Sequence, residues 1–293
     1  EKEGGGPVML IKEYRLLLPL TIEEYHLAQL YMVSKSSREE TGQAAGEGIE
    51  IVKNEPYETN EYGMPPGQYT EKIFHLKSRV PKFIALVIPN AAMELTERSW
   101  NAFPKCMTVY EHKWLGEKFH MSVETMHVDD RGNLENANGL SREDLAARQV
   151  DYLNIACDDP NVKMVPGEDP TKFLSKKTGR GKLAPKWAEA HDPCMCAYKV
   201  VKLHIRVAGQ TKVEQWGQYY GMRAPFISYH RKLFCWIDEW FGLTIDDIRA
   251  MEAETVDITN KKRLESIAKA EEEAAAKAAG RGSFFARKTP AKV

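Results

Sequence analysis

Apolar and polar residues alternate along much of the first half of the chain, with the period of two that is typical of half-buried strands. Pro, Gly and Asn interrupt the alternation at short intervals, as turns between antiparallel neighbours do. The pattern predicts a meander of antiparallel strands over Ile49–Lys53, Gln68–Lys77, Lys82–Ile88, Cys106–His112 and Phe119–His127.

The last of these runs indicates how the two faces of the predicted sheet differ. Phe119, Met121 and Val123 are apolar, and the residues between them are polar. Successive side chains of a strand point to opposite faces, so one face is apolar and the other is wet. We therefore expect the sheet to be covered on one side only.

A strand and a helix precede the meander. The apolar segment Met9–Leu18 predicts a strand that ends at Pro19. Thr21 and Glu24 then have the spacing of a capping box, in which each side chain bonds the other residue's backbone N–H. This pair predicts the start of a helix at Thr21.

A short helix, a strand and a long loop follow the meander. Ser141 and Asp144 predict a capped helix through Arg148, and Val150–Ala156 predicts a further strand. The segment Cys157–Pro193 has no sustained period and is longer than most connections within a domain. Such a loop is either functional or mobile, and we favour a functional one.

The last part of the chain is mainly helical after one more strand. Alternation over Val201–Val207 predicts a half-buried strand that closes at Gly209. Aromatic residues at helical spacing over Lys212–Trp240 predict helices interrupted at Pro225. Thr244 and Asp247 cap a further helix, and from Lys261 the charged, Ala-rich tail predicts a solvated helix that frays into disorder.

Composition excludes several classes of protein. A net charge of -1 gives no global attraction to nucleic acid. No apolar run approaches the roughly 18–20 residues needed to cross a bilayer. Five cysteines, an odd number, favour reduced thiols in the cytoplasm. Residues 1–8 are glycine-rich and polar, so we interpret them as a cloning remnant or a disordered segment.

The predicted strand Gln68–Lys77 carries the most informative face. Its period places Thr70, Lys72, Phe74 and Leu76 on one side. An unpaired ammonium is costly to bury, so Lys72 needs solvent, a carboxylate or a bound anion. Lys72 is then either an edge residue that reaches water or part of a cavity with a polar end and an apolar end. An amphiphile with an anionic head fits the second alternative.

Three motifs of catalytic appearance do not support an enzyme. Ser175–Lys182 has the composition of a phosphate-binding loop, but its order is wrong for a Walker lysine. His191, Cys194 and Cys196 resemble metal ligands, but no second pair at a zinc-site spacing follows, so we expect no metal site. The turn Gly42–Gly48 is an isolated glycine-rich segment.

Several segments together resemble the class I phosphatidylinositol transfer proteins. The similarity extends over roughly Met9 to Lys262. Its main strings are Lys12-Glu13-Tyr14-Arg15, Asn54-Glu55-Pro56-Tyr57-Glu58, Gly67-Gln68-Tyr69-Thr70, Trp100-Asn101-Ala102, Lys177-Thr178-Gly179-Arg180-Gly181, Cys196-Ala197-Tyr198-Lys199, Leu233-Phe234-Cys235-Trp236 and Asp246-Asp247-Ile248-Arg249.

The resemblance implies an α+β, START-like (helix-grip) fold. In this fold a concave, mostly antiparallel sheet and long helices enclose one phospholipid. It also implies that Thr70, Lys72, Asn101 and Glu252 bind the inositol headgroup, with Glu254 as the alternative carboxylate. Inositol hydroxyls need both donors and acceptors, which these residues supply.

Five further positions follow from the same resemblance. Cys106 and Tyr229 match positions related to choline lipid, although we expect phenylalanine where Tyr229 stands. Ser175 matches a regulatory phosphorylated serine. Val207-Ala208 stands where relatives often have a membrane-inserting tryptophan pair, so we expect weaker anchoring there and faster dissociation from membranes.

We therefore expect a non-enzymatic, cytoplasmic carrier that exchanges phosphatidylinositol or phosphatidylcholine during transient contact with membranes. Phe74 and Leu76 are expected to contact the lipid, and no other cofactor is implied. The alternatives are a module that presents lipid to a partner such as a phosphoinositide kinase, or a carrier of another lipid. We expect a monomer with a transfer domain over residues 9–262, a regulatory or membrane-facing loop over 157–193, and a tail over 263–293.

Overall fold

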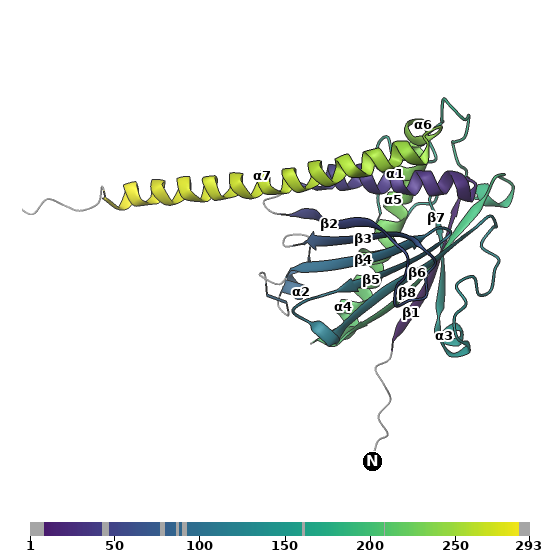
Figure 1. Cartoon of the computed structure of the whole chain (residues 1–293), viewed down its shortest axis with the longest axis horizontal. Coiled ribbons are helices and arrows are strands. Elements are labelled where there is room, and N and C mark those ends of the chain that lie inside the picture. Colours follow the sequence, from purple (N-terminus) through teal and green to yellow (C-terminus); the bar gives the residue numbers. More distant parts are fainter. Residues whose placement is uncertain are drawn as a thin grey trace, which may run out of the picture.

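A curved sheet of eight strands forms the body of the protein in the computed structural model (Figure 1), which describes residues 9–42, 47–76, 80–85, 88–89, 93–159, 162–207 and 209–286. The strand order is β2-β3-β4-β5-β6-β8-β1-β7. All neighbours are antiparallel except β1 and β7. The strands are β1 (Leu10–Leu18), β2 (Gly48–Tyr57), β3 (Gly67–His75), β4 (Glu94–Ala102), β5 (Lys105–Glu111), β6 (Phe119–Val128), β7 (Gln149–Asn154) and β8 (Met195–Ile205).

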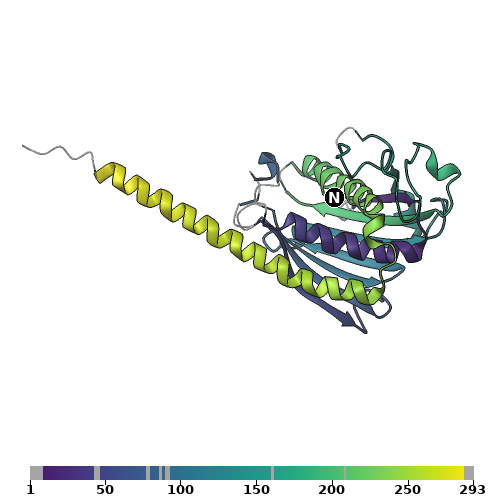
Figure 2. The same cartoon turned by 90° about the horizontal axis from the view of Figure 1, so that it is seen from above.

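Helices α1, α5 and the first part of α7 lie over the same face of the sheet, which we call the inner face (Figure 2). Beyond the sheet, α7 continues as an isolated helix (Figure 1). The α-helices are α1 (Ile22–Glu40), α2 (Lys82–Ala85), α3 (Arg142–Ala147), α4 (Gln210–Trp216), α5 (Ala224–Cys235), α6 (Ile237–Trp240) and α7 (Ile245–Ala286). Short 3₁₀ turns cover Gly116–Lys118 and Trp187–Glu189.

The predicted helix starts are confirmed by their caps. The Thr21 hydroxyl accepts a bond from the Glu24 backbone N–H, and the Glu24 carboxylate accepts one from the Thr21 N–H. The Ser141 side chain caps α3 in the same way by accepting from the backbone N–H of Asp144. Thr244 and Asp247 exchange equivalent bonds at the start of α7. Each cap satisfies a backbone donor that the first helical turn leaves without a partner.

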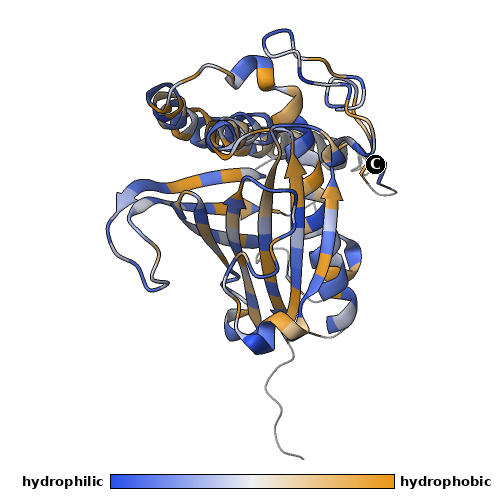
Figure 3. Ribbon diagram, turned by 90° about the vertical axis from the view of Figure 1, so that its right-hand side faces the viewer, coloured by the Kyte–Doolittle hydropathy of each residue, from blue (hydrophilic) through white to orange (hydrophobic). Residues whose placement is uncertain are grey.

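The main core lies between the inner face and the helices. It includes Leu16, Met121, Val201 and Leu203 of the sheet and Phe234 of α5. Hydrophobic and hydrophilic residues alternate along the strands, as the period of two requires (Figure 3).

The outer face is not wet throughout. On it, Ile11 of β1 and Val200 of β8 pack with Leu140 in a second, smaller cluster. The prediction that the sheet is covered on one side only is therefore wrong for β1 and β8, where the segment before α3 crosses the outer face.

Two predictions between residues 80 and 102 are wrong. The predicted strand Lys82–Ile88 is helix α2 over Lys82–Ala85, and the backbone N–H of Ile88 bonds the carbonyl of Ile84. Both of these isoleucines are buried at i,i+4 spacing. The strand β4 (Glu94–Ala102) was not predicted, because charged residues interrupt its apolar alternation.

The other elements follow the predictions closely, with one irregularity. The predicted strands at Val150–Ala156 and Val201–Val207 are β7 and β8, and β8 begins six residues earlier than expected. Seven residues of π-helix, Gly217–Arg223, join α4 to α5, and Pro225 is the second residue of α5. The widened turns lie ahead of a proline that cannot donate a backbone bond. The predicted interruption is therefore a change of helix type.

Candidate functional site

The register of the strands arranges the inner-face side chains in rows that cross the sheet. One row runs through Lys72, Glu97, Tyr110, Met121 and Leu203. The next row runs through Thr70, Ser99, Thr108, Val123 and Val201. A third runs through Asn101, Cys106, Thr125, Lys199 and Tyr14. The period of β3 predicts Thr70 and Lys72 on one face, and the register adds Asn101 and Cys106 to the same face.

Along the first two rows the inner face changes from polar to apolar. On β3, β4 and β5 it carries Thr70, Lys72, Glu97, Ser99 and Thr108. On β6 and β8 the same rows carry only Met, Val and Leu. The sheet therefore has one region suited to a polar group and one suited to hydrocarbon, on a single continuous surface.

Lys72 lies beside a carboxylate that sequence analysis missed. Its Nζ is 3.6 Å from Oε1 of Glu97, and the two side chains are 13% and 14% exposed. Because β3 lies between β2 and β4, Lys72 is not an edge residue, and that alternative is wrong. The pair combines a donor and an acceptor within reach of the same half-buried surface.

Asn101 and Cys106 lie side by side on β4 and β5. The Asn101 side-chain carbonyl is buried and accepts no hydrogen bond from the described residues. The Cys106 thiol lies 3.4 Å from the Ser99 hydroxyl, which in turn contacts the Thr108 hydroxyl at 2.9 Å. A buried acceptor without a donor is costly, so a ligand that donates to Asn101 would stabilise this end of the row.

The structure distinguishes the two candidate carboxylates of α7. Glu252 lies on the helix face that also carries the buried Ile248, Thr255 and Thr259, and its side chain is 13% exposed. It accepts a bond from Arg249 at 2.6 Å. Glu254 is 63% exposed and pairs with Arg38 of α1. Of the two, only Glu252 faces the interior.

The remaining predicted lipid contacts lie at separate places around the inner face. Phe74 pairs with Leu95 on β4 and points to the same side as Lys72. Leu76 is one residue beyond β3, where its backbone N–H bonds the carbonyl of Met93. The Tyr229 hydroxyl, which phenylalanine would lack, donates to Glu40 at 2.7 Å and links α5 to α1.

Lys199 of β8 lies on the inner face and was not among the predicted site residues. Desolvation by the surrounding protein lowers the pKa of its ammonium. Its side chain is nevertheless half-buried, so part of it is accessible. Its Nζ is 5.3 Å from the ring centre of Phe226. Within the described part of the chain, no carboxylate lies within salt-bridge distance of it. The sequence contains a signal for this position, because the period of two in β8 places Lys199 on the same face as Val201 and Leu203.

The histidines near Lys199 do not carry a charge that could pair with its ammonium. Burial and the nearby Lys199 ammonium lower the pKa of His230 to about 3 and that of His127 well below its usual range. Both imidazoles are therefore neutral at pH 7. The His230 ring contacts the Tyr25 hydroxyl at 2.9 Å, and burial raises the pKa of that tyrosine. Lys199 thus supplies a positive charge to surroundings that do not neutralise it.

Ser175 is placed in a hairpin-like part of the long loop, where Leu174 pairs with Gly181. Its side chain is buried, and its hydroxyl donates to Asp238 of α6 at 2.6 Å. The same carboxylate accepts from the backbone N–H groups of Lys176 and Lys177. A kinase could reach this hydroxyl only after the loop leaves α6.

Among the described residues, no group of three or more His, Cys, Asp or Glu side chains is arranged to hold a metal ion. The helices that the structure describes include none with the length and hydropathy of a membrane span. Position 208 of the Val207-Ala208 pair lies outside the described residues, and Val207 is partly buried against the main core.

Similarity to known proteins agrees with this geometry. Residues 9–257 match the sequence profile of the family described as phosphatidylinositol transfer protein. Phosphatidylinositol transfer protein 2 of Dictyostelium discoideum is 50% identical over 262 residues, covering 89% of this chain and 99% of the relative. The human phosphatidylinositol transfer protein beta isoform is 42% identical over 271 residues, covering 89% and 96%. The predicted resemblance and α+β fold are confirmed, and the chain belongs to the phosphatidylinositol transfer protein family, whose members are lipid transfer proteins rather than enzymes.

Proposed function

We propose that this protein holds a single molecule of phosphatidylinositol or phosphatidylcholine between the inner face and helices α1, α5 and α7, and exchanges it between membranes. The observation that carries the proposal is Lys199, a deep and half-buried cation without a carboxylate partner among the described residues. An ammonium that is partly removed from water is stabilised by an anion, and both lipids carry a phosphodiester.

The inositol headgroup would lie over the polar region of the inner face. Thr70 and Lys72 of β3, Asn101 of β4 and Glu252 of α7 supply donors and acceptors for its hydroxyls. The orphaned Asn101 carbonyl and the inward-facing Glu252 support this assignment. Phosphatidylcholine has no ring of hydroxyls, so it gains less from these residues. For that lipid, Cys106 and Tyr229 are the positions we expect to influence affinity.

The acyl chains would lie along the apolar region of β6 and β8 and against Phe74 and Leu76. At about 0.8 kcal/mol per CH₂, exposing two chains of roughly sixteen carbons to water costs on the order of 25 kcal/mol. An apolar enclosure removes most of this barrier. Exchange then needs opening at a membrane, replacement of the lipid and closure, without a covalent step.

Such a carrier would work in the cytoplasm as a monomer that contacts membranes transiently. It could deliver phosphatidylinositol to a membrane-bound kinase, and phosphorylation of Ser175 would loosen the long loop from α6, because a phosphate would face the Asp238 carboxylate. A module that presents lipid without net transfer is the alternative. Transfer between donor and acceptor vesicles separates the two functions.

The direct test is mass spectrometry of lipids extracted from the purified full chain after incubation with mixed vesicles. We expect both lipids in the native protein, loss of both in Lys199→Met, and selective loss of phosphatidylinositol in Lys72→Ala. Lys202→Ala is the matched control, because Lys202 is on the same strand, faces outward and pairs with Asp144 at 2.8 Å. Absence of phospholipid from the native chain would refute the proposal.

A further inference from the structure

Trp114 is the most exposed tryptophan of the protein. It lies in the connection between β5 and β6, residues 112–118, which we call the β5–β6 turn, and it is 53% exposed. The chain has six tryptophans. The other five, Trp100, Trp187, Trp216, Trp236 and Trp240, are buried or half-buried. Exposing so large an apolar side chain to water is unfavourable unless it has a partner.

The β5–β6 turn is a well-ordered support for this side chain. The next residue, Leu115, is buried in the main core, and its backbone N–H bonds the His112 ring at 3.3 Å. The Gly116 N–H bonds the His112 carbonyl at 2.9 Å, and Gly116 adopts φ +52°. Because the turn is anchored on both sides of Trp114, the indole is held outward rather than left on a loose loop.

Exposed cations surround the indole in the chain and across the neighbouring loop. Lys113 and Lys118 flank it in the turn, with Glu117 as the exposed acid among them. The backbone N–H of Arg206, also exposed, bonds the carbonyl of Lys118 at 2.7 Å. This bond places the residues after β8 beside the turn. Glu111, directly before the turn, is also exposed, but it pairs with Arg98 at 3.2 Å. The local surface therefore combines a large aromatic with more cations than acids.

The same end of the sheet presents a second exposed aromatic. Antiparallel pairing places the β3–β4 connection, with α2, at the end that carries the β5–β6 turn. Figures 1 and 2 both show α2 beside the start of α4, which follows β8. Phe83 of α2 is exposed, and so is its neighbour Lys82.

The exposed aromatic at the opposite end of the sheet has acidic neighbours. Tyr62, in the connection between β2 and β3, is the exposed aromatic there, and the exposed acids Glu58 and Glu61 lie next to it in the chain. An aromatic among carboxylates does not suit an anionic surface. The charged neighbours of Tyr62 and Trp114 therefore differ in sign.

We propose that the β5–β6 turn docks the protein on anionic bilayers, with Trp114 in the interface and Lys113, Lys118 and Arg206 on the lipid headgroups. Tryptophan is the side chain best suited to the boundary between headgroups and acyl chains. Lysine and arginine near an anionic leaflet add attraction that falls off within a Debye length. The proposal rests on the proposed carrier function and specifies which end of the protein meets the membrane.

The test is cosedimentation of the full chain with vesicles of phosphatidylcholine alone or mixed with phosphatidylserine, at low and high salt. We expect Trp114→Ala to lower partitioning to the mixed vesicles about tenfold. The double variant Lys113→Ala/Lys118→Ala should lower it roughly tenfold or more at low salt and change little on neutral vesicles. Binding should also shift tryptophan emission to the blue, and this shift should be lost in Trp114→Ala.

Matched controls separate docking from general surface effects. Tyr62→Ala removes an exposed aromatic at the opposite end, and Lys172→Ala/Lys186→Ala removes two cations that are each 84% exposed elsewhere. Both should partition like the native chain. Native partitioning of Trp114→Ala, with phospholipid still extracted from the protein, would overturn the docking surface and leave the carrier function intact. If the native protein contains no phospholipid, the carrier function fails instead, whatever the partitioning.

Discussion

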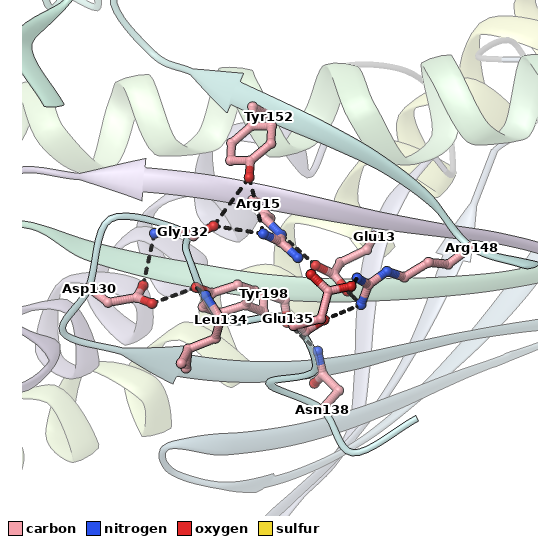
Figure 4. Close-up of polar contacts among 10 residues, drawn as sticks. All are labelled: Glu13, Arg15, Asp130, Gly132, Leu134, Glu135, Asn138, Arg148, Tyr152 and Tyr198. Atoms are coloured by element: carbon pink, nitrogen blue, oxygen red, sulfur yellow. Dashed lines mark hydrogen bonds and ion pairs between the residues drawn. The ribbon is translucent and has the colours of Figure 1, made fainter. Parts of the chain in front are cut away.

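A cation on the outer face of the sheet and one on its inner face, Arg15 and Lys199, differ in their carboxylate partners. On the outer face, Glu13 lies between two arginines and accepts bonds from Arg15 at 2.6 Å and from Arg148 at 2.8 Å (Figure 4). The guanidinium of Arg15 also donates to the Gly132 carbonyl, and Arg148 donates to Glu135. On the inner face, the described residues provide no such partners for Lys199.

The segment between β6 and α3 also bonds a buried tyrosine of the outer face. The Tyr198 hydroxyl donates to Asp130 at 2.6 Å and accepts from the Leu134 backbone N–H at 2.9 Å (Figure 4). A buried charge network is tolerable when its groups are satisfied. The arginines of the outer face are satisfied within the fold, whereas Lys199 has no carboxylate partner among the described residues.

Substitution at Glu13 should have the largest effect on stability. Glu13→Gln leaves two buried guanidinium groups without their shared carboxylate, so the free energy of unfolding should fall by about 3–5 kcal/mol. Denaturant unfolding measures this change. Glu135→Gln is the control, because its carboxylate bonds the same Arg148 but is 80% exposed, and it should cost less than about 1 kcal/mol. Equal losses in the two variants would remove the distinction between the faces.

Lys199→Met should show the reverse behaviour. Replacing an ammonium that lacks a carboxylate partner in the described structure with an apolar side chain of similar length should leave the unfolding free energy of the lipid-free protein unchanged or higher. Affinity for both phospholipids should fall by about tenfold to a hundredfold, as expected for a lost charged hydrogen bond. Lipid titration and denaturant unfolding of one preparation give both numbers. A large loss of stability without loss of lipid would show that Lys199 is structural.

Lys72→Ala should have a smaller and more selective effect. Lys72 lies on the polar part of the inner face with Glu97, so its loss should weaken phosphatidylinositol by roughly tenfold and leave phosphatidylcholine almost unchanged. Competition between the two lipids in a vesicle transfer assay measures the ratio directly. If both lipids weaken equally, Lys72 acts through the phosphodiester or the fold rather than through inositol.

Acidification should produce the smallest effect, at the contact between the long loop and α6. Hydrogen bonds from Ser175 and from two backbone N–H groups lower the pKa of Asp238 below its ordinary value of 3.8. The carboxylate form therefore favours the docked loop above pH 3.8, and this contribution disappears as the pH falls through the lowered pKa. NMR titration of the Lys176 and Lys177 amides should report a midpoint below 3.8, and Asp238→Asn should abolish it.

Local signals predicted most elements of the fold, and failed where tertiary contacts decide. Capping pairs at Thr21, Ser141 and Thr244 correctly marked helix starts, because a cap is a contact between near neighbours in the chain. The strand β4 was missed because its inner face is polar. The polar side chains that we propose for the headgroup are the ones that remove its hydrophobic period.

The site was predictable only in part for a related reason. The period of β3 placed Thr70 and Lys72 on one face, but which side chains lie beside them depends on register, and register depends on pairing with β4. Glu97 could therefore not be placed. Lys199 could have been found, since the alternation of β8 extends back to it, but nothing local shows that it lacks a carboxylate.

The side-chain amide of Asn260 in α7 has a consequence for self-association. It bonds both the backbone N–H and the carbonyl of Ile51 at 3.1 Å, close to an irregularity of β2, which forms one margin of the sheet. A side chain thus occupies the donor and acceptor that a further strand would use. If α7 moves away from the sheet to admit lipid, the same movement exposes the unpaired backbone groups of the edge strand β2. Molecules held in this open state should therefore aggregate more readily than closed ones.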